Sequence, residues 1–135
     1  MGATVQQKVE TFLAQGAFAV VGASTLREKY GNKVLRCYQQ HGRKVFPINP
    51  REPEVEGLKA YKALAALPEP VPAISIITPP AITEQVVRDA AAAGVTHVWM
   101  QPGAESVEAV RAAEELGLSV IAGGPCLLVV LGYRD

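Results

Sequence analysis

The chain has 135 residues with 13 basic and 13 acidic side chains, so its formal net charge is zero. A hydrophobic content of 49% against 19% charged residues excludes a disordered chain. Zero net charge and a pI near 6.7 argue against a nucleic-acid binder, which needs a basic excess to neutralise phosphates. The length predicts one domain, residues 1–135, whose core folds without metals or disulfides.

No run of 18 apolar residues occurs, and the first ten residues are polar, so we expect neither a membrane span nor a secretory signal. The two cysteines, Cys37 and Cys126, form no zinc-type or C-x-x-C spacing. We interpret them as free thiols of a cytoplasmic protein without a metal site.

A helical pattern over residues 4–15 opens the chain, and we expect residues 1–16 to pack on the domain as a helix. Continuous apolar runs, typical of strands covered on both faces, follow at residues 17–21, 44–48, 73–78, 96–101 and 118–122. Helical patterns fill the gaps at residues 32–41, 60–66, 82–93 and 106–116. This alternation predicts an α/β fold: a single Rossmann-like, doubly wound domain with a mainly parallel sheet of about five strands and helices on both faces.

Ligands of such sheets bind beyond the carboxyl ends of the strands, and each predicted strand here ends in a loop rich in glycine, proline or small polar residues. In the first loop Gly22 and Ala23 permit close backbone approach to a phosphate, and the hydroxyls of Ser24 and Thr25 add donors. The loop is not a G-x-G-x-x-G motif, so a plain strand-to-helix turn is the alternative.

Three cations, Arg27, Lys29 and Lys33, follow this loop, and they either neutralise phosphates or lie on a solvated surface. The loop after the second strand, Asn49-Pro50-Arg51, lacks the carboxylate that NAD enzymes place there for the ribose. Arg51 instead suits a phosphate on the ribose. The sequence therefore disfavours NAD and leaves open a ligand with an extra ribose phosphate.

Few residues suit catalysis. His41 lies at a predicted helix end, where a capping or solvated role is expected, and His97 lies at an apolar strand start, where it is expected to pack. Cys126 follows the fifth strand and is a candidate reactive thiol lining the crevice, but neither histidine is placed to act as its base. No metal-ligand spacing occurs. We assign no catalytic residue.

Seven short motifs occur in order over residues 17–128. They are Gly22-Ala23-Ser24, Tyr30-Gly31-Asn32-Lys33, Pro47-Ile48-Asn49-Pro50, Glu56-Gly57, Thr78-Pro79-Pro80, Trp99-Met100-Gln101-Pro102-Gly103 and Cys126. Together they resemble the small stand-alone CoA-binding proteins, whose domain is similar to the N-terminal CoA-binding domain of the succinyl-CoA synthetase α subunit.

The resemblance implies that coenzyme A binds at the carboxyl ends of the strands, with its phosphates held by residues 22–27. Residues 49–52 match the segment where the synthetases place a lysine against CoA, and this chain has Arg51 and Glu52 there. The loops Thr78-Pro79-Pro80 and Met100-Gln101-Pro102 match the synthetase loops that contact the rest of the cofactor. The resemblance thus completes the predicted cofactor site: Gly22, Ala23, Ser24, Thr25, Arg27, Lys33, Asn49, Pro50, Arg51, Thr78, Pro79, Pro80, Met100, Gln101, Pro102 and Gly103.

The synthetases also have a glutamate near the position of Pro102, a second domain with a phosphorylated histidine, and an ATP-grasp partner, none of which we find in this sequence. The leading hypothesis is therefore a module that binds, carries or senses CoA or an acyl-CoA. The alternatives are a CoA-dependent or thiol–disulfide exchange enzyme that uses Cys126, and an NADP-binding regulator. The apolar tail, residues 126–131, is either a last buried strand or a surface for self-association, so a homo-oligomer or a protein partner stays open.

Overall fold

The computed structural model describes residues 3–135; Met1 and Gly2, the start of the predicted N-terminal segment, lie outside the described residues. Five strands form one parallel sheet in the order β2–β1–β5–β6–β7. All five lie within one or two residues of the predicted bounds, which confirms the sheet. The strands are β1 Phe18–Val21, β2 Val45–Ile48, β5 Ala73–Ile76, β6 His97–Met100 and β7 Ser119–Ile121.

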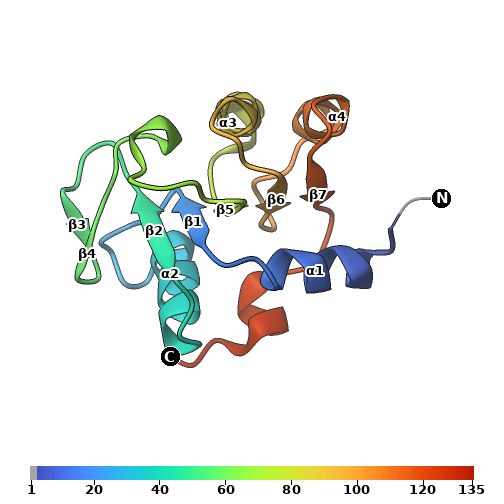
Figure 1. The fold of residues 1–135 in the computed structure, drawn as a ribbon. Helices are drawn as coiled ribbons and strands as arrows, with labels where there is room; N and C mark the ends of the chain where they lie inside the picture. Colours follow the sequence, from blue (N-terminus) through green and yellow to red (C-terminus); the bar gives the residue numbers. More distant parts are fainter. Residues whose placement is uncertain (1–2) are drawn as a thin grey trace.

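Helices cover both faces of the sheet, as the doubly wound fold requires (Figure 1). Helices α1 (Val5–Leu13) and α2 (Tyr30–Gln40) lie on one face, and α3 (Pro80–Ala92) and α4 (Val107–Glu115) lie on the other. The strands read as continuous apolar runs because alternate residues enter opposite layers: Phe18 and Val20 of β1 pack with α1 and α2, while Ala19 and Val21 join the α3–α4 layer.

Helix α1 packs on the sheet through Phe12, its buried residue, together with the partly buried Val9 and Leu13. Thr4 caps its start by accepting a hydrogen bond from the Gln7 amide at 3.1 Å. The Phe12 ring is fully buried and lies edge-on to Trp99, with ring centres 5.2 Å apart. This contact joins the N-terminal segment to the centre of the domain.

The helix predicted over residues 60–66 is wrong. Only the short 3₁₀ turn Leu64–Ala66 forms, and it is preceded by a hairpin of β3 (Glu54–Val55) and β4 (Leu58–Lys59) that the sequence did not predict. Tyr61 pairs with the outer edge of β2, donating its amide to the Pro47 carbonyl at 3.0 Å and accepting from the Asn49 amide at 2.9 Å. Pairing with an open sheet edge outweighs the helical propensity of this alanine-rich stretch.

The C-terminal tail does not form a last buried strand. It makes a helical turn, Leu128–Gly132, closed by a hydrogen bond from the Tyr133 amide to the Leu128 carbonyl, and this turn packs against α2. Leu127, just before the turn, is fully buried, whereas Val129 is 80% exposed. Within residues 3–135 no helix is long and apolar enough to cross a membrane.

Candidate functional site

The strand order reverses between β1 and β5, because the chain leaves β1 through α2 on one face and leaves β5 through α3 on the other (Figure 1). The carboxyl ends of the strands beside such a switch point are where open α/β sheets bind ligands. Gly22 follows β1 at this point and Ile77 follows β5. The fold therefore brings the predicted loops to one edge of the sheet.

A groove of about 700 Å³ lies at this edge, and we call it the main groove. Its apolar walls include Ile48, Leu64 and Val86, and it contains the cations Arg51 and Lys62. It gathers seven of the predicted site residues: Gly22, Ala23, Asn49, Pro50, Arg51, Thr78 and Pro79.

The sequence did not predict a role for Lys62, which carries no spacing signal. Lys62 reaches the main groove because its neighbour Tyr61 pairs with the edge of β2. Among the described residues neither Arg51 nor Lys62 has a carboxylate within ion-pair distance. Asp89, which also lines the groove, accepts instead from the Gln85 amide at 2.9 Å. The main groove therefore contains two cations without an ion-pair partner in the described part of the chain, Arg51 and Lys62, and one carboxylate, Asp89, that already accepts a hydrogen bond.

The Asn49 side chain forms hydrogen bonds to both the loop after β1 and the loop after β2, which line the main groove. Its Nδ2 donates to the Ala23 carbonyl at 2.9 Å, and its Oδ1 accepts from the amides of Arg51 and Glu52 at 2.8 and 3.0 Å. This arrangement fixes the backbone at Arg51 against the loop after β1. The side chain of Arg51 stays exposed at the rim.

Position 22 must be glycine because the backbone there lies against the backbone of Ile77, a contact that the sequence did not predict. Its φ is +98°, and a Cβ atom there would lie 2.0 Å from the Ile77 carbonyl oxygen. Gly31 of α2 is equally constrained, since its Cβ would lie 2.0 Å from the Gly22 carbonyl oxygen. Both glycines therefore let α2, the loop after β1 and the end of β5 approach each other closely.

The long loop before α2 is folded onto the protein. Arg27 forms an ion pair with Glu56, at the tip of the β3–β4 hairpin, at 2.8 Å. The buried Asn32 donates both to Glu56 Oε2 at 3.0 Å and to the Ser24 carbonyl at 2.8 Å. The Ser24 hydroxyl accepts from the Leu26 amide at 3.1 Å. Arg27 is thus a paired cation in this structure, although the sequence offered it as a phosphate ligand.

A second hollow of about 360 Å³ lies beside the start of α2, and we call it the thiol pocket. Cys126 and Tyr30 meet there, with the phenol oxygen 2.6 Å from the sulfur. The Tyr30 hydroxyl also lies 3.2 Å from Gln101 Oε1. Burial raises the pKa of Tyr30 above its usual value, so the phenol is neutral near pH 7. The residues lining the pocket are Glu28, Tyr30, Lys33, Pro102, Cys126 and Leu128.

The predicted residues are therefore divided between two hollows rather than gathered in one. Lys33, Pro102 and Cys126 line the thiol pocket. Met100 and Gln101 are fully buried, so that loop exposes only Pro102 and Gly103. The remaining predicted residues, Ser24, Thr25, Arg27, Pro80 and Gly103, line neither hollow.

The histidines lie away from both hollows. His41 Nε2 lies 2.7 Å from the Gly132 carbonyl oxygen, and His97 Nδ1 lies 2.7 Å from the Thr96 hydroxyl. Desolvation lowers the pKa of His97. In residues 3–135 no group of three His, Cys, Asp or Glu side chains could hold a metal ion.

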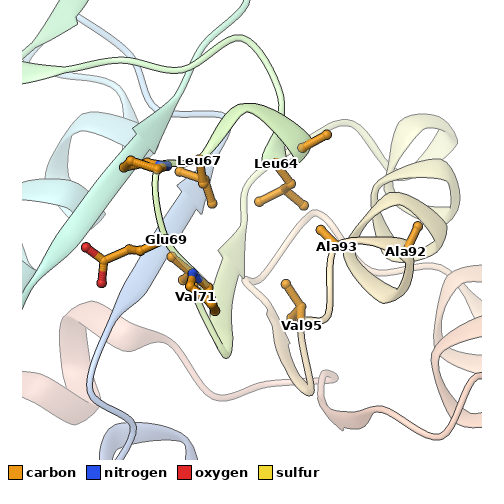
Figure 2. Close-up of a pocket in the computed structure, with 10 residues that line it drawn as sticks. Leu64, Leu67, Glu69, Val71, Ala92, Ala93 and Val95 are labelled. Carbon is orange, nitrogen blue, oxygen red and sulfur yellow. The ribbon is translucent and has the colours of Figure 1, made fainter.

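An apolar hollow of about 490 Å³ lies at the opposite end of the sheet (Figure 2). Figure 2 shows Leu64, Val71 and Val95 around it, while the Glu69 carboxylate extends away from them. Glu69 instead pairs with Lys44 at 2.6 Å. Among residues 3–135 neither Arg nor Lys lines this hollow, in contrast to the main groove, although Leu64 lines both.

The comparisons with known proteins identify the family of the chain and agree with its fold. The sequence pattern of a family described as a CoA binding domain matches residues 16–132. The alpha subunit of the ADP-forming acetate–CoA ligase II from Pyrococcus furiosus is 34% identical over 91 residues. This stretch makes up 67% of this chain and 20% of that protein. A hypothetical protein from Pyrococcus horikoshii OT3 superposes with a TM-score of 0.87 and 30% identity over 95% of this chain and 89% of its own.

A third similarity is to a solved dinucleotide-forming acetyl-coenzyme A synthetase 1 from Ca. Korarchaeum cryptofilum, in complex with phosphate and ADP. The TM-score is 0.72 at 34% identity, over 79% of this chain and 25% of that chain. This chain therefore spans about a fifth of the ligase subunit and a quarter of the synthetase.

Proposed function

This chain belongs to the CoA-binding domain family, and from that membership we propose that it binds coenzyme A or an acyl-CoA at the carboxyl ends of its strands. The family resemblance drawn from the sequence is confirmed. The related ligase and synthetase carry this region as a minor part of larger chains. The ligase and the synthetase both act with CoA, and a single domain of this size can supply the binding of that cofactor.

The observation that carries the proposal is the pair of unpaired cations in the main groove. A guanidinium forms paired hydrogen bonds to phosphate oxygens, and a lysine adds a mobile positive charge. Arg51 follows β2, where an NAD-binding sheet would hold a carboxylate that repels a ribose phosphate. The apolar walls of the groove suit an adenine ring between these cations and the Gly22 loop.

We assign the chain a binding, carrying or sensing role in the cytoplasm rather than turnover. Both cysteines are free thiols, which fits a reducing compartment. Neither histidine lines the main groove or the thiol pocket, so among residues 3–135 no imidazole lies in position to act as a base for Cys126. The binding of a nucleotide cofactor needs none.

The direct test is titration of protein stripped of copurified nucleotide with CoA, dephospho-CoA, NAD and NADP under reducing conditions. At 100 times its dissociation constant CoA stabilises the fold by about 2.7 kcal/mol, which a thermal-shift assay resolves easily. The absence of a shift with CoA refutes the proposal, and a larger shift with NADP than with CoA favours the regulator instead.

A matched pair of variants tests the groove itself. Arg51→Gln should weaken CoA binding roughly tenfold and reduce the preference for CoA over dephospho-CoA, because it removes a charged phosphate donor. Arg111→Gln makes the same change on α4, beside a different hollow, and should leave the affinity unchanged. Equal affinities in both variants would place the ribose phosphate elsewhere.

A further inference from the structure

Cys126 is held in place by its two neighbours in the chain. The Pro125 carbonyl accepts a hydrogen bond from the Trp99 indole at 3.0 Å, and the Leu127 amide donates to Gln101 Oε1 at 2.9 Å. Trp99 and Gln101 are both fully buried at the end of β6. The Cys126 carbonyl also accepts from the Val129 and Val130 amides at 3.1 and 2.9 Å. The thiol is therefore carried on a rigid turn rather than on a loose tail.

The side chain of Cys126 has a partner suited to either protonation state. As a thiol it donates to the Tyr30 oxygen, 2.6 Å away, and the Tyr30 hydroxyl then donates to Gln101 Oε1. As a thiolate it accepts the Tyr30 proton instead, while Gln101 Oε1 keeps its bond from Leu127. The phenol can thus stabilise a sulfur anion, which is the reactive form of a cysteine.

Gln101 provides an independent sign that this cluster is built for more than packing. Its side chain is fully buried, yet within residues 3–135 its Nε2 has no hydrogen-bond partner. The bond from the Leu127 amide identifies Oε1 as the acceptor, so the orphaned atom is the amide donor. An unpaired buried donor is costly, and the oxygen of the same amide lies 3.2 Å from the Tyr30 hydroxyl that contacts Cys126.

The two cysteines differ in access. Cys126 is partly exposed and lines the thiol pocket together with Lys33 and Glu28. Cys37 is fully buried in α2, where desolvation raises its pKa to about 11. A reagent that enters the pocket therefore meets one reactive thiol.

The thiol pocket is also within reach of the main groove. Arg51 follows β2 and Pro102 follows β6, three strand spacings away in the sheet, or about 14 Å. We infer that Cys126 is a covalent site for the thiol end of the bound cofactor and forms a mixed disulfide by exchange with a CoA disulfide. This inference rests on the proposed function, since it requires the nucleotide end of CoA to lie in the main groove.

The exchange is balanced without a further oxidant. The Cys126 thiolate attacks one sulfur of the CoA disulfide, a new sulfur–sulfur bond forms to the protein, and the original one breaks. The second CoA leaves as a thiolate and takes up the proton that Cys126 released. The disulfide bond is conserved in number, and excess reducing thiol reverses the step.

The test exposes the protein to CoA disulfide, or to the same concentration of pantethine, which has the same pantetheine disulfide but lacks the nucleotides. Intact mass and peptide mapping measure the adduct. CoA disulfide should modify Cys126 on the order of 100-fold faster than pantethine, because the nucleotide raises the local concentration of the disulfide. Tyr30→Phe should slow the reaction roughly tenfold through loss of the donor to the thiolate.

Cys126→Ser should form no adduct, while Cys37→Ala should react like the unchanged protein. Equal rates with CoA disulfide and pantethine, or modification of Cys37 instead, overturn the inference. Binding of reduced CoA to the unchanged protein in excess reductant is measured separately. Binding of reduced CoA combined with no adduct from CoA disulfide refutes the covalent site alone, whereas no binding of reduced CoA refutes the proposed function.

Discussion

Replacing Gly31 with alanine tests the close approach between α2 and the loop after β1. In most helices this change stabilises the protein by about 1 kcal/mol, because alanine has the higher helix propensity. Here the new Cβ would lie 2.0 Å from the Gly22 carbonyl oxygen, and must retreat by about 1.4 Å to reach an ordinary contact of 3.4 Å. Both partners are backbone, so neither can rotate away as a side chain would.

Overpacking of this kind costs about 3 kcal/mol at the upper end of its usual range, and subtracting the gain in propensity leaves a net loss of about 2 kcal/mol. For a domain of this size that corresponds to a fall of roughly 8 °C in Tm. Urea denaturation and calorimetry would measure it. Gly16→Ala is the matched control, since its Cβ would meet nothing within 4 Å, and should be neutral or slightly stabilising. Equal stabilities of the two variants would refute the packing argument.

Three further predictions address the layers around the sheet. Phe12→Ala should cost about 3–5 kcal/mol and shift the fluorescence of Trp99 to the red, because the ring of Phe12 is buried edge-on to the indole; an unshifted spectrum would contradict this. Asn32→Ala should cost about 2 kcal/mol in urea denaturation, since it removes the two hydrogen bonds that the buried amide donates to the partly buried Ser24 carbonyl and Glu56 carboxylate. Arg27→Gln removes only an exposed ion-pair partner and should cost under about 1 kcal/mol. Desolvation lowers the pKa of His97 in the folded protein, so as the pH falls the unfolded chain is protonated at this histidine before the folded protein is. The free energy of unfolding should therefore decrease as the pH falls below about 6.5. His97→Gln should flatten this part of the pH–stability curve, and identical curves for the two proteins would show that His97 does not contribute.

The sheet could be predicted closely because helices cover both of its faces. Each strand then becomes an uninterrupted apolar run, and alternation of side chains between two buried layers leaves no polar face to obscure it. The hairpin at Glu54–Val55 and Leu58–Lys59 escaped prediction for the opposite reason. Its strands have two residues each, and its turn uses Glu56 and Gly57 at φ values of 49° and 79°, where Asn-Gly would have been the recognisable signal.

The positions of the predicted site residues at one edge of the sheet follow from the sequence, but their contact partners do not. Spacing from a strand end says where a loop lies, and it does not say whether a side chain meets solvent or another element. Arg27 shows this, since Glu56 that pairs with it comes from a hairpin that was not predicted. Gln101 shows it too, because the tail that buries it returns from the end of the chain through Leu127. Lys62 was missed because only the pairing of Tyr61 brings it to the groove.

The division of the edge into two hollows follows from the crossover connections. At the switch point β1 and β5 stay paired to their ends, and the loop after β1 lies so close to Ile77 that a Cβ on Gly22 would meet the Ile77 carbonyl oxygen. The cations of the main groove lie on the β2 side of this contact, and Cys126 follows β7 on the other side. A ligand that uses both must be elongated and must pass over Gly22. The zero net charge of the chain therefore conceals an uneven edge, with two unpaired cations at one end and a thiol at the other, and this arrangement fits the proposed cofactor, which is long and ends in sulfur, better than a compact nucleotide.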